Sequence, residues 1–205
     1  MNVSVVIPTI LADVEMLAGC VEGVVQTTGI KPIVIHGGTF AENCNHGADE
    51  ADGDLLVFLN DDTELLTGWL PPLVAAFDDP KVGCAGARLV YPDGRVQHAG
   101  VSFRQRDGLL EAFNITDELP TRDVEAVTGA CLAIRAELFA ELGGFDESYR
   151  NGYEDVDLCL RVGLAGWSIR YVAESVVVHF ESASGPARWA HVRENIALLQ
   201  ERWAS

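Results

Sequence analysis

The sequence predicts an α/β domain with a mostly parallel central sheet and flanking helices. Three short apolar runs, at residues 3–7, 33–35 and 55–59, suit strands that are buried on both faces. Helical patterns lie between these runs, and this alternation predicts parallel strands joined by right-handed crossovers. A length of 205 residues fits one compact domain, and we expect a single domain over residues 1–205.

In the first half of the chain, a few residues set the ends of the expected elements. Pro8 is expected to end the first strand. Asp13 is placed to cap the helix that follows, and Gly29 to stop it. Two more helices are expected. One covers residues 41–51, and the other covers residues 67–77 and is capped by Thr67.

The second half of the chain has a more mixed pattern. A strong turn signal at residues 91–94 predicts a hairpin, and the polar residues 104–123 are expected to form a loop. The other expected elements are strands at 82–91, 96–103, 124–134, 169–172 and 176–179, helices at 135–142 and 154–165, and an amphipathic helix at 186–203.

The composition argues against several classes of function. With 14 Lys and Arg against 31 Asp and Glu, the formal net charge is −17, which opposes binding to nucleic acid and to anionic lipid. Five cysteines without a C-x-x-C pair argue against a disulfide framework or a structural zinc site and favour a reducing compartment. No apolar run has the length of a membrane span, so we expect a soluble, cytoplasmic protein.

Two carboxylates follow the third apolar run. Asn60, Asp61 and Asp62 come directly after residues 55–59, at the edge where open α/β sheets bind ligands. Their oxygens suit a hard divalent cation, which would hold a diphosphate, although Asp also favours turns and helix caps. His179 ends a later strand, where an imidazole is either a surface residue or a metal ligand.

A second acidic cluster opens the helix expected at residues 154–165. In the functional interpretation, one of the residues Glu154, Asp155 and Asp157 is a base that takes a proton from an attacking hydroxyl. A structural interpretation stands beside it, because the helix dipole favours carboxylates in a first turn. Asp157 also lies four residues before Arg161, which suits a surface ion pair.

The order of these pieces resembles the inverting family 2 glycosyltransferases of the GT-A (Rossmann-like) fold, especially their rhamnosyltransferase-like branch. The resemblance covers nearly the whole chain, and residues 152–161, Gly-Tyr-Glu-Asp-Val-Asp-Leu-Cys-Leu-Arg, are its most specific part. The segments that carry it are 3–9, 58–63 in the position of the family's D-x-D motif, 88–100, 128–131, 143–147 and 152–161, followed by His179.

This resemblance implies roles for the acidic residues. Asp62 would bind the metal, and His179 would complete the protein's ligands. Asp61 would contact the ribose of the donor or the metal shell. Asp155 would be the catalytic base, and Glu154 beside it would assist the base or orient the acceptor.

The resemblance also implies contacts with the donor. Pro8 and Thr9 would border the nucleobase. The backbone of Gly129 and Ala130 would approach the donor sugar or the acceptor. Arg188 would reach the diphosphate once the segment after the last strand closes.

Two departures from the family pattern affect the nucleotide pocket. His36 stands where the family has an Asp that reads the uracil ring, and a neutral imidazole does not reproduce a carboxylate acceptor. Relative to the family pattern, about 20 residues of helix and strand are also skipped after this point. We therefore expect the fold to lack one edge strand and helix, so that strand 33–35 becomes the edge of the sheet.

The function implied by the resemblance is transfer of a sugar, with inversion, from a nucleotide-diphosphate sugar to an acceptor hydroxyl. The donor would be UDP-, dTDP- or GDP-linked, the metal Mn²⁺ or Mg²⁺, and the acceptor a glycan, a lipid-linked glycan or a protein. Residues 1–103 would bind nucleotide and metal, and residues 124–205 the acceptor. The alternatives are a catalytically degenerate module that binds nucleotide or sugar, and an acidic scaffold domain.

Overall fold

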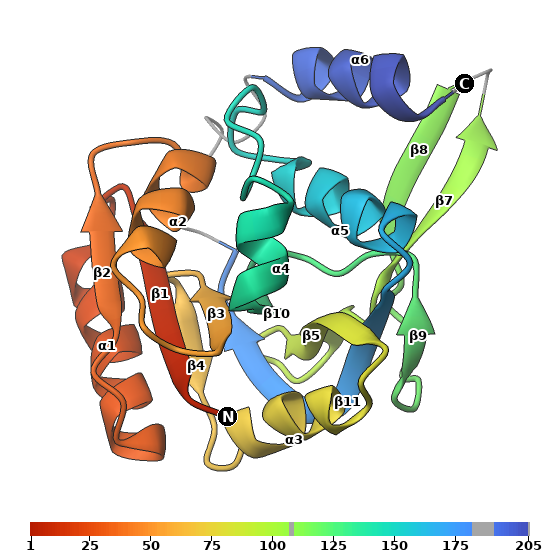
Figure 1. Cartoon of the computed structure of the whole chain (residues 1–205). Coiled ribbons are helices and arrows are strands. Elements are labelled where there is room, and N and C mark those ends of the chain that lie inside the picture. The colour runs from red at the N-terminus through yellow and green to blue at the C-terminus, as the bar shows by residue number, and fades with distance from the viewer. Residues whose placement is uncertain (107–108, 182–190, 205) are drawn as a thin grey trace.

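The computed structural model describes residues 1–106, 109–181 and 191–204, and these residues form a central sheet covered by helices on both faces (Figure 1). The path through the sheet follows the order β2-β1-β3-β10-β5-β11-β4. These strands are β1 Val3–Thr9, β2 Ile33–His36, β3 Leu55–Leu59, β4 Thr63–Leu65, β5 Val82–Val90, β10 Cys131–Arg135 and β11 Ser168–His179. Beside this path, β6 (Val96–His98) pairs with β5, and β9 (Arg122–Val124) pairs with β11.

The sheet is mixed but mostly parallel, as the sequence predicted. Strands β2, β1, β3, β5 and β11 run in one direction, whereas β10 and β4 run in the other. Because β10 is antiparallel, its first residues lie at the edge where its neighbours end. There the N–H of Asn60, after β3, donates to the carbonyl of Ala130, before β10, at 3.0 Å.

Two apolar cores lie on opposite faces of the sheet. Along β1, Val5 and Ile7 belong to one core and Val6 to the other, as the two-residue period of a strand requires. The first core takes side chains from α1 (Val14–Thr28) and α3 (Leu70–Ala75). The second takes them from α2 (Phe40–Asp49), α4 (Ala136–Glu141) and α5 (Glu154–Leu164). The strands of the sheet therefore read as continuous apolar runs.

The first helix begins and ends where the sequence predicted. The Asp13 side chain accepts from the N–H of Met16 at 3.0 Å, and Gly29 closes the helix in a left-handed conformation with φ 74°. The expected end of β1 at Pro8 was wrong, because the strand continues to Thr9. Pro8 lies beyond the last residue of β1 that pairs with β3, so only β2 borders the strand there and a proline is tolerated.

Other expectations needed correction in the second half of the chain. Of the loop expected at 104–123, residues 115–121 are a loop, whereas a separate two-stranded sheet pairs β7 (Val101–Arg106) with β8 (Leu109–Asn114). The two strands expected after residue 168 form the single, irregular strand β11. The helix expected over 67–77 is shorter, consisting of α3 and a 3₁₀ turn at Ala76–Asp78, and Thr67 does not cap it.

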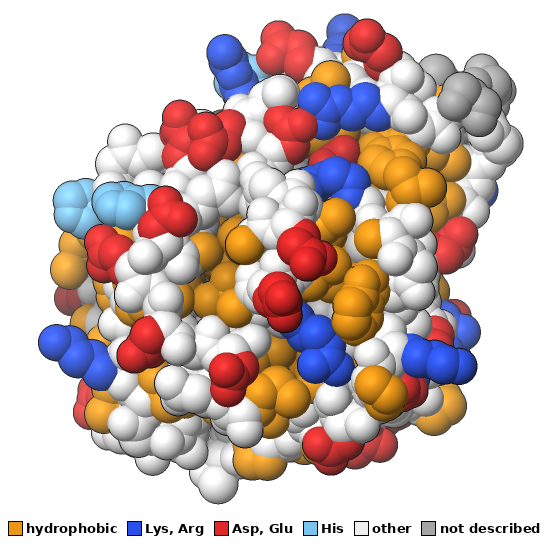
Figure 2. Space-filling view, viewed as in Figure 1, with side chains coloured by type: hydrophobic (Ala, Val, Ile, Leu, Met, Phe, Trp, Pro, Cys, Tyr) orange, Lys and Arg blue, Asp and Glu red, His pale blue; other side chains and the backbone are white. Residues whose placement is uncertain are grey.

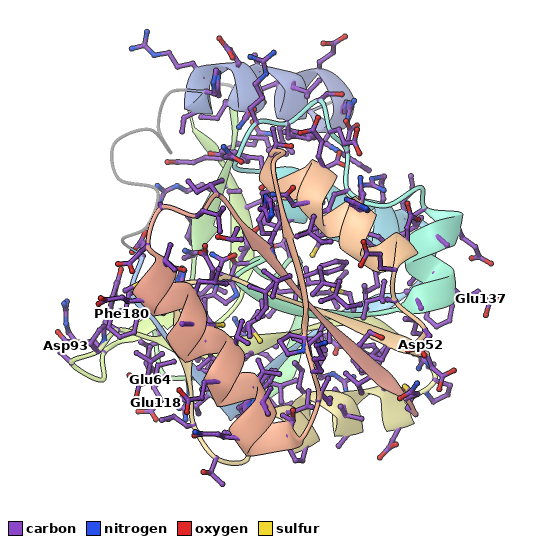
Figure 3. The ribbon with its side chains drawn as sticks, turned by 90° about the vertical axis from the view of Figure 1, so that its left-hand side faces the viewer. Asp52, Glu64, Asp93, Glu118, Glu137 and Phe180 are labelled. Atoms are coloured by element: carbon purple, nitrogen blue, oxygen red, sulfur yellow. The ribbon has the colours of Figure 1, made fainter. Side chains whose placement is uncertain are left out.

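The acidic composition is visible on the surface. Figure 2 shows Asp and Glu side chains spread over the face that it presents, with Lys and Arg side chains among them. In Figure 3 the labelled Asp52, Glu64, Asp93, Glu118 and Glu137 lie at the periphery, and all five are exposed. The five cysteines are buried and free. Within the described residues, no helix has the length and apolarity that crossing a bilayer requires.

Candidate active site

A cavity of about 270 Å³ opens at the edge of the sheet where β1, β3 and β11 end and β10 begins. It is lined by residues from at least six separate segments of the chain. These residues are Pro8, Thr9, Ile10, Phe40, Asn43, Asn60, Asp61, Asp62, Thr128, Gly129, Ala130, Asn151, Gly152, Glu154, Asp155, His179 and Glu181.

A buried carboxylate and imidazole form one corner of this cavity. Asp62 Oδ1 lies 3.1 Å from His179 Nε2, and both residues are under a tenth exposed. Pairing of β4 with β11 sets this contact, because Thr63 lies opposite His179 in the ladder. The N–H of Phe180 also donates to the carbonyl of Asp62 at 3.0 Å. One carboxylate and one imidazole suit a divalent cation such as Mn²⁺.

Asp61 lies beside this corner but is held by β1. The hydroxyl of Thr9 donates to Asp61 Oδ2 at 2.5 Å, and the same hydroxyl oxygen accepts from the N–H of Leu11. Burial raises the pKa of Asp61, while the Thr9 hydrogen bond opposes that shift. Among the described residues, no three His, Cys, Asp or Glu side chains are grouped to hold a metal. Asp62 and His179 form a pair, so a cation there would need further ligands from a substrate or water.

A second pair of carboxylates faces the cavity from the first turn of α5. Asp155 Oδ2 accepts from the N–H of Gly129, and its Oδ1 from the N–H of Val156, both at 2.8 Å. Glu154 Oε2 accepts from the N–H of Gly152 at 2.6 Å. Burial, followed by the charge of Asp155, raises the pKa of Glu154 to about 8. Burial also raises the pKa of Asp155, against the hydrogen bonds that lower it.

The approach of residues 128–130 to α5 requires glycine. A Cβ added at Gly129 would lie 2.9 Å from the ring of Phe40 and 3.4 Å from the Cβ of Asp155. A side chain at this position would therefore push the turn away from α5 and lengthen the hydrogen bond between Gly129 N–H and Asp155.

The turn that leads into α5 has an unusual backbone. Asn151, Gly152 and Tyr153 all have positive φ, at 51°, 147° and 75°, which is costly for residues other than glycine. Asn195, on α6 (Val192–Trp203), stabilises it by accepting from the N–H of Arg150 and donating to the carbonyl of Gly152 at 2.8 Å. The strained turn therefore depends on packing against α6.

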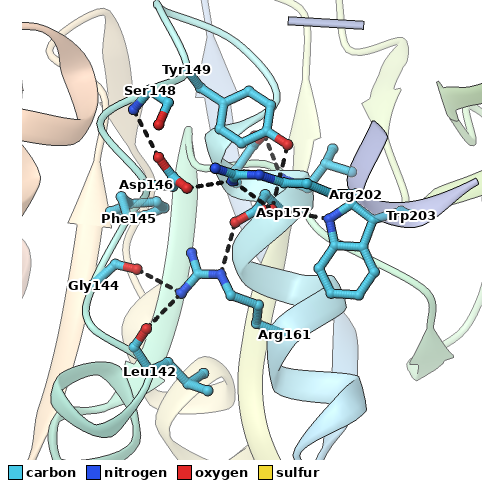
Figure 4. Close-up of polar contacts among 12 residues, drawn as sticks. Leu142, Gly144, Phe145, Asp146, Ser148, Tyr149, Asp157, Arg161, Arg202 and Trp203 are labelled. Atoms are coloured by element: carbon cyan, nitrogen blue, oxygen red, sulfur yellow. Dashed lines mark hydrogen bonds and ion pairs between the residues drawn. The ribbon is translucent and has the colours of Figure 1, made fainter. Parts of the chain in front are cut away.

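Asp157 has a different environment from Glu154 and Asp155, and Figure 4 shows its polar contacts. Its Oδ2 pairs with Arg161 Nε at 2.7 Å, and its Oδ1 accepts from Trp203 Nε1 at 3.0 Å. Arg202 lies 3.6 Å from the same Oδ1. The surface ion pair expected between Asp157 and Arg161 was wrong in one respect, because the Asp157 side chain is only 1% exposed. Packing of α6 against α5 covers it.

Most of the predicted site residues come together in the cavity. Those that line it are Pro8, Thr9, Asp61, Asp62, Gly129, Ala130, Glu154, Asp155 and His179. His36 does not line it, although it pairs with Thr9 in the ladder between β1 and β2, and its side chain is exposed. Arg188 lies outside the described residues.

Several residues of the site were not found from the sequence. Asn43 donates to the carbonyls of Thr9 and Gly38, and so holds the end of β1 against α2. Asn60 Nδ2 lies 3.2 Å from His179 Nε2, and its place directly before the two aspartates was the available signal. Gln97 also contacts His179, from β6, and no pattern in the sequence connects these two positions.

The chain is similar to several known proteins. The model of the family described as glycosyl transferase family 2 matches residues 14–143. The chain is 38% identical over 151 residues to the O-antigen biosynthesis protein RfbC of Myxococcus xanthus, covering 68% of this chain and 12% of that protein. It is 32% identical over 171 residues to the N-acetylglucosaminyl-diphospho-decaprenol L-rhamnosyltransferase of Mycobacterium tuberculosis, covering 73% of this chain and 56% of that enzyme.

Among solved structures, GalNAc-T7 with UDP, GalNAc and Mn²⁺ superimposes with a TM-score of 0.72 at 19% identity, over 87% of this chain and 43% of that one. At this identity the likeness shows the fold. The chain spans less than two thirds of each of these proteins.

Proposed function

Because the chain belongs to glycosyl transferase family 2, we propose that it transfers a sugar from a nucleotide-diphosphate sugar to an acceptor hydroxyl, with inversion and with a divalent cation. One observation carries this proposal. The Asp62–His179 corner and the partly buried Asp155 carboxyl come from different elements and face the same cavity. The first can hold the metal that binds a diphosphate, and the second can accept a proton.

The proposed reaction is a single displacement. The acceptor oxygen bonds to the anomeric carbon as the bond from that carbon to the phosphate oxygen breaks, and the acceptor proton passes to Asp155. The N–H of Gly129 fixes the Asp155 carboxylate during this transfer. With a pKa near 8, Glu154 stays protonated at neutral pH and can donate a hydrogen bond to the acceptor. A bound cation would stabilise the charge that develops on the departing diphosphate.

The nucleoside is proposed to bind along the end of β1. Pro8 and Thr9 line the cavity there, and Asp61 is held beside them by the Thr9 hydroxyl, where it can accept from a ribose hydroxyl or join the metal shell. His36 borders Thr9 on the edge strand β2 and is our candidate for reading the base. The edge position of β2 fits a chain that lacks the family's outer strand and helix. Arg188 remains our candidate for the diphosphate.

Thermal stabilisation by UDP, dTDP and GDP, each with Mn²⁺ and with EDTA, tests the proposal first. A ligand that binds only the folded protein raises its melting temperature. We expect one nucleotide to stabilise the wild type only with Mn²⁺, and a His179→Ala variant to lose most of that response. No response to any of the three nucleotides would contradict the donor site. Binding without product from the matching sugar nucleotide would favour the degenerate module instead.

A further inference from the structure

The His179 side chain is held from behind by a buried glutamine. Gln97, on β6, is 6% exposed, and its Oε1 lies 2.7 Å from His179 Nδ1. Its Nε2 donates to the carbonyl of His179 at 3.2 Å and lies 3.5 Å from Glu181 Oε2. The glutamine therefore contacts both the ring and the backbone of the same residue.

These contacts fix which way the Gln97 amide points. If the amide were flipped, its oxygen would face two acceptors, the carbonyl of His179 and the carboxylate of Glu181. With the amide as it stands, Oε1 can only accept, so His179 Nδ1 must carry the hydrogen. In a neutral imidazole Nε2 then has the lone pair, in agreement with the Asn60 Nδ2 donor placed 3.2 Å away.

We infer that Gln97 is a positioning residue that keeps His179 Nδ1 protonated, so that Nε2, beside Asp62, is the nitrogen available to a divalent cation. This inference rests on the proposed function, because it concerns the proposed metal corner. Partners of a ligating imidazole commonly set its tautomer and its ring orientation in this way. The opposite tautomer would direct an N–H toward Asp62 and close the corner to a cation.

His98, the next residue along β6, offers an internal comparison. Its Nδ1 lies 3.2 Å from Asn114 Oδ1, and its Nε2 accepts from the N–H of Thr128 at 3.3 Å. Both histidines thus have Nδ1 on a side-chain amide oxygen. Nε2 of His98 accepts a hydrogen bond from the backbone, whereas Nε2 of His179 faces Asp62 and the cavity.

Nitrogen-15 NMR of the metal-free protein, at a pH where the rings are neutral, tests the tautomer directly. In the wild type we expect His179 Nδ1 to carry the hydrogen and Nε2 to show the shift of an unprotonated ring nitrogen. Gln97→Met fills the space but accepts nothing, and should lose this tautomer. Gln97→Glu keeps an oxygen opposite Nδ1, and in its protonated form its hydroxyl can donate to the carbonyl of His179 in place of Nε2, so it should restore this tautomer. The His98 signals should not move in either variant, which controls for general unfolding.

Binding of Mn²⁺ alone, followed by electron paramagnetic resonance, supplies the second readout. Gln97→Met should weaken Mn²⁺ binding by about 10- to 100-fold, and Gln97→Glu should not. Gln26→Met, at an exposed position of α1, is the control and should bind as the wild type does.

An unchanged His179 tautomer or an unchanged Mn²⁺ affinity in Gln97→Met would overturn the inference. A role in packing alone predicts the opposite order, with Met tolerated and Glu disruptive. If the wild type itself bound no Mn²⁺, the proposed metal corner would be wrong and the inference with it. The NMR measurement uses no metal, so that result is distinguishable from a failure of the tautomer alone.

Discussion

The cleft side and the inner side of α5 hold their carboxylates by different means. At the cleft, Glu154 and Asp155 accept hydrogen bonds from the backbone, and no cationic side chain of the described residues pairs with them. Two residues after Asp155 in the same helix, Asp157 pairs with Arg161 and lies near Arg202. Guanidinium partners favour one permanent charge state, whereas a buried carboxyl without them can exchange a proton. The difference separates a group suited to chemistry from a group suited to anchoring a helix.

Removing the cleft carboxylate should produce the largest effect. We expect Asp155→Asn to lower sugar transfer by about 10²- to 10⁴-fold, because an amide cannot accept the acceptor's proton. The melting temperature should fall only slightly, because no ion pair is lost and the amide gives up one of the two backbone hydrogen bonds that the carboxylate accepts. Product formation and thermal unfolding measure the two effects. Asp52→Asn, at an exposed position, is the control, and near-normal transfer by Asp155→Asn would rule out this base.

Removing the inner carboxylate should instead destabilise the fold. Asp157→Asn takes the charge from a buried partner of Arg161 and should lower the free energy of unfolding by about 3 kcal/mol. Urea unfolding measures this loss. The matched control is Asp123→Asn, which breaks the more exposed pair with Arg170 and should cost less than about 1 kcal/mol. Equal losses in the two variants would show that Asp157 does not anchor α6.

A pH dependence should sharpen the comparison further. The pKa of Glu154 is raised from 4.5 to about 8, so between these values the unfolded chain releases a proton that the folded chain retains. Glu154 therefore destabilises the wild type as pH rises through this window. Glu154→Gln removes the titration, and its stability relative to wild type should rise by on the order of 2 kcal/mol from pH 5 to pH 8. Parallel stability curves for the two proteins would contradict this, and Glu137→Gln is the exposed control.

Much of the fold could be predicted because local signals agreed with tertiary ones. The apolar runs became β1, β2 and β3, and the cap at Asp13 and the glycine at 29 bound α1 as expected. The cleft could be located because strand ends meet at one edge of a parallel sheet. The apolar runs and the helix caps are made by residues that are close together in the chain, which is why the sequence alone predicts them.

The features that were missed depend on distant contacts. Polar residues in β7 and β8 obscure the alternation of apolar and polar side chains that would predict strands. Contacts with distant residues hold this segment in place, such as the two hydrogen bonds between the Gln200 side chain and the backbone of Leu110. Asp157 looked like a surface residue because nothing near it in sequence indicates that Trp203 covers it. The Gln97–His179 contact joins positions 82 residues apart.

The antiparallel strand β10 has a consequence for the synthesis of the protein. It fills the gap between β3 and β5, so one edge of β3, five buried apolar residues, has no partner until residues 131–135 are made. At about 5 to 20 residues per second, that interval lasts roughly 4 to 15 seconds. Throughout it, the nascent chain presents an unpaired apolar strand edge, which is a template for aggregation. We therefore expect protection by chaperones, or slower translation beforehand, to matter more for the yield of this protein than for its final stability.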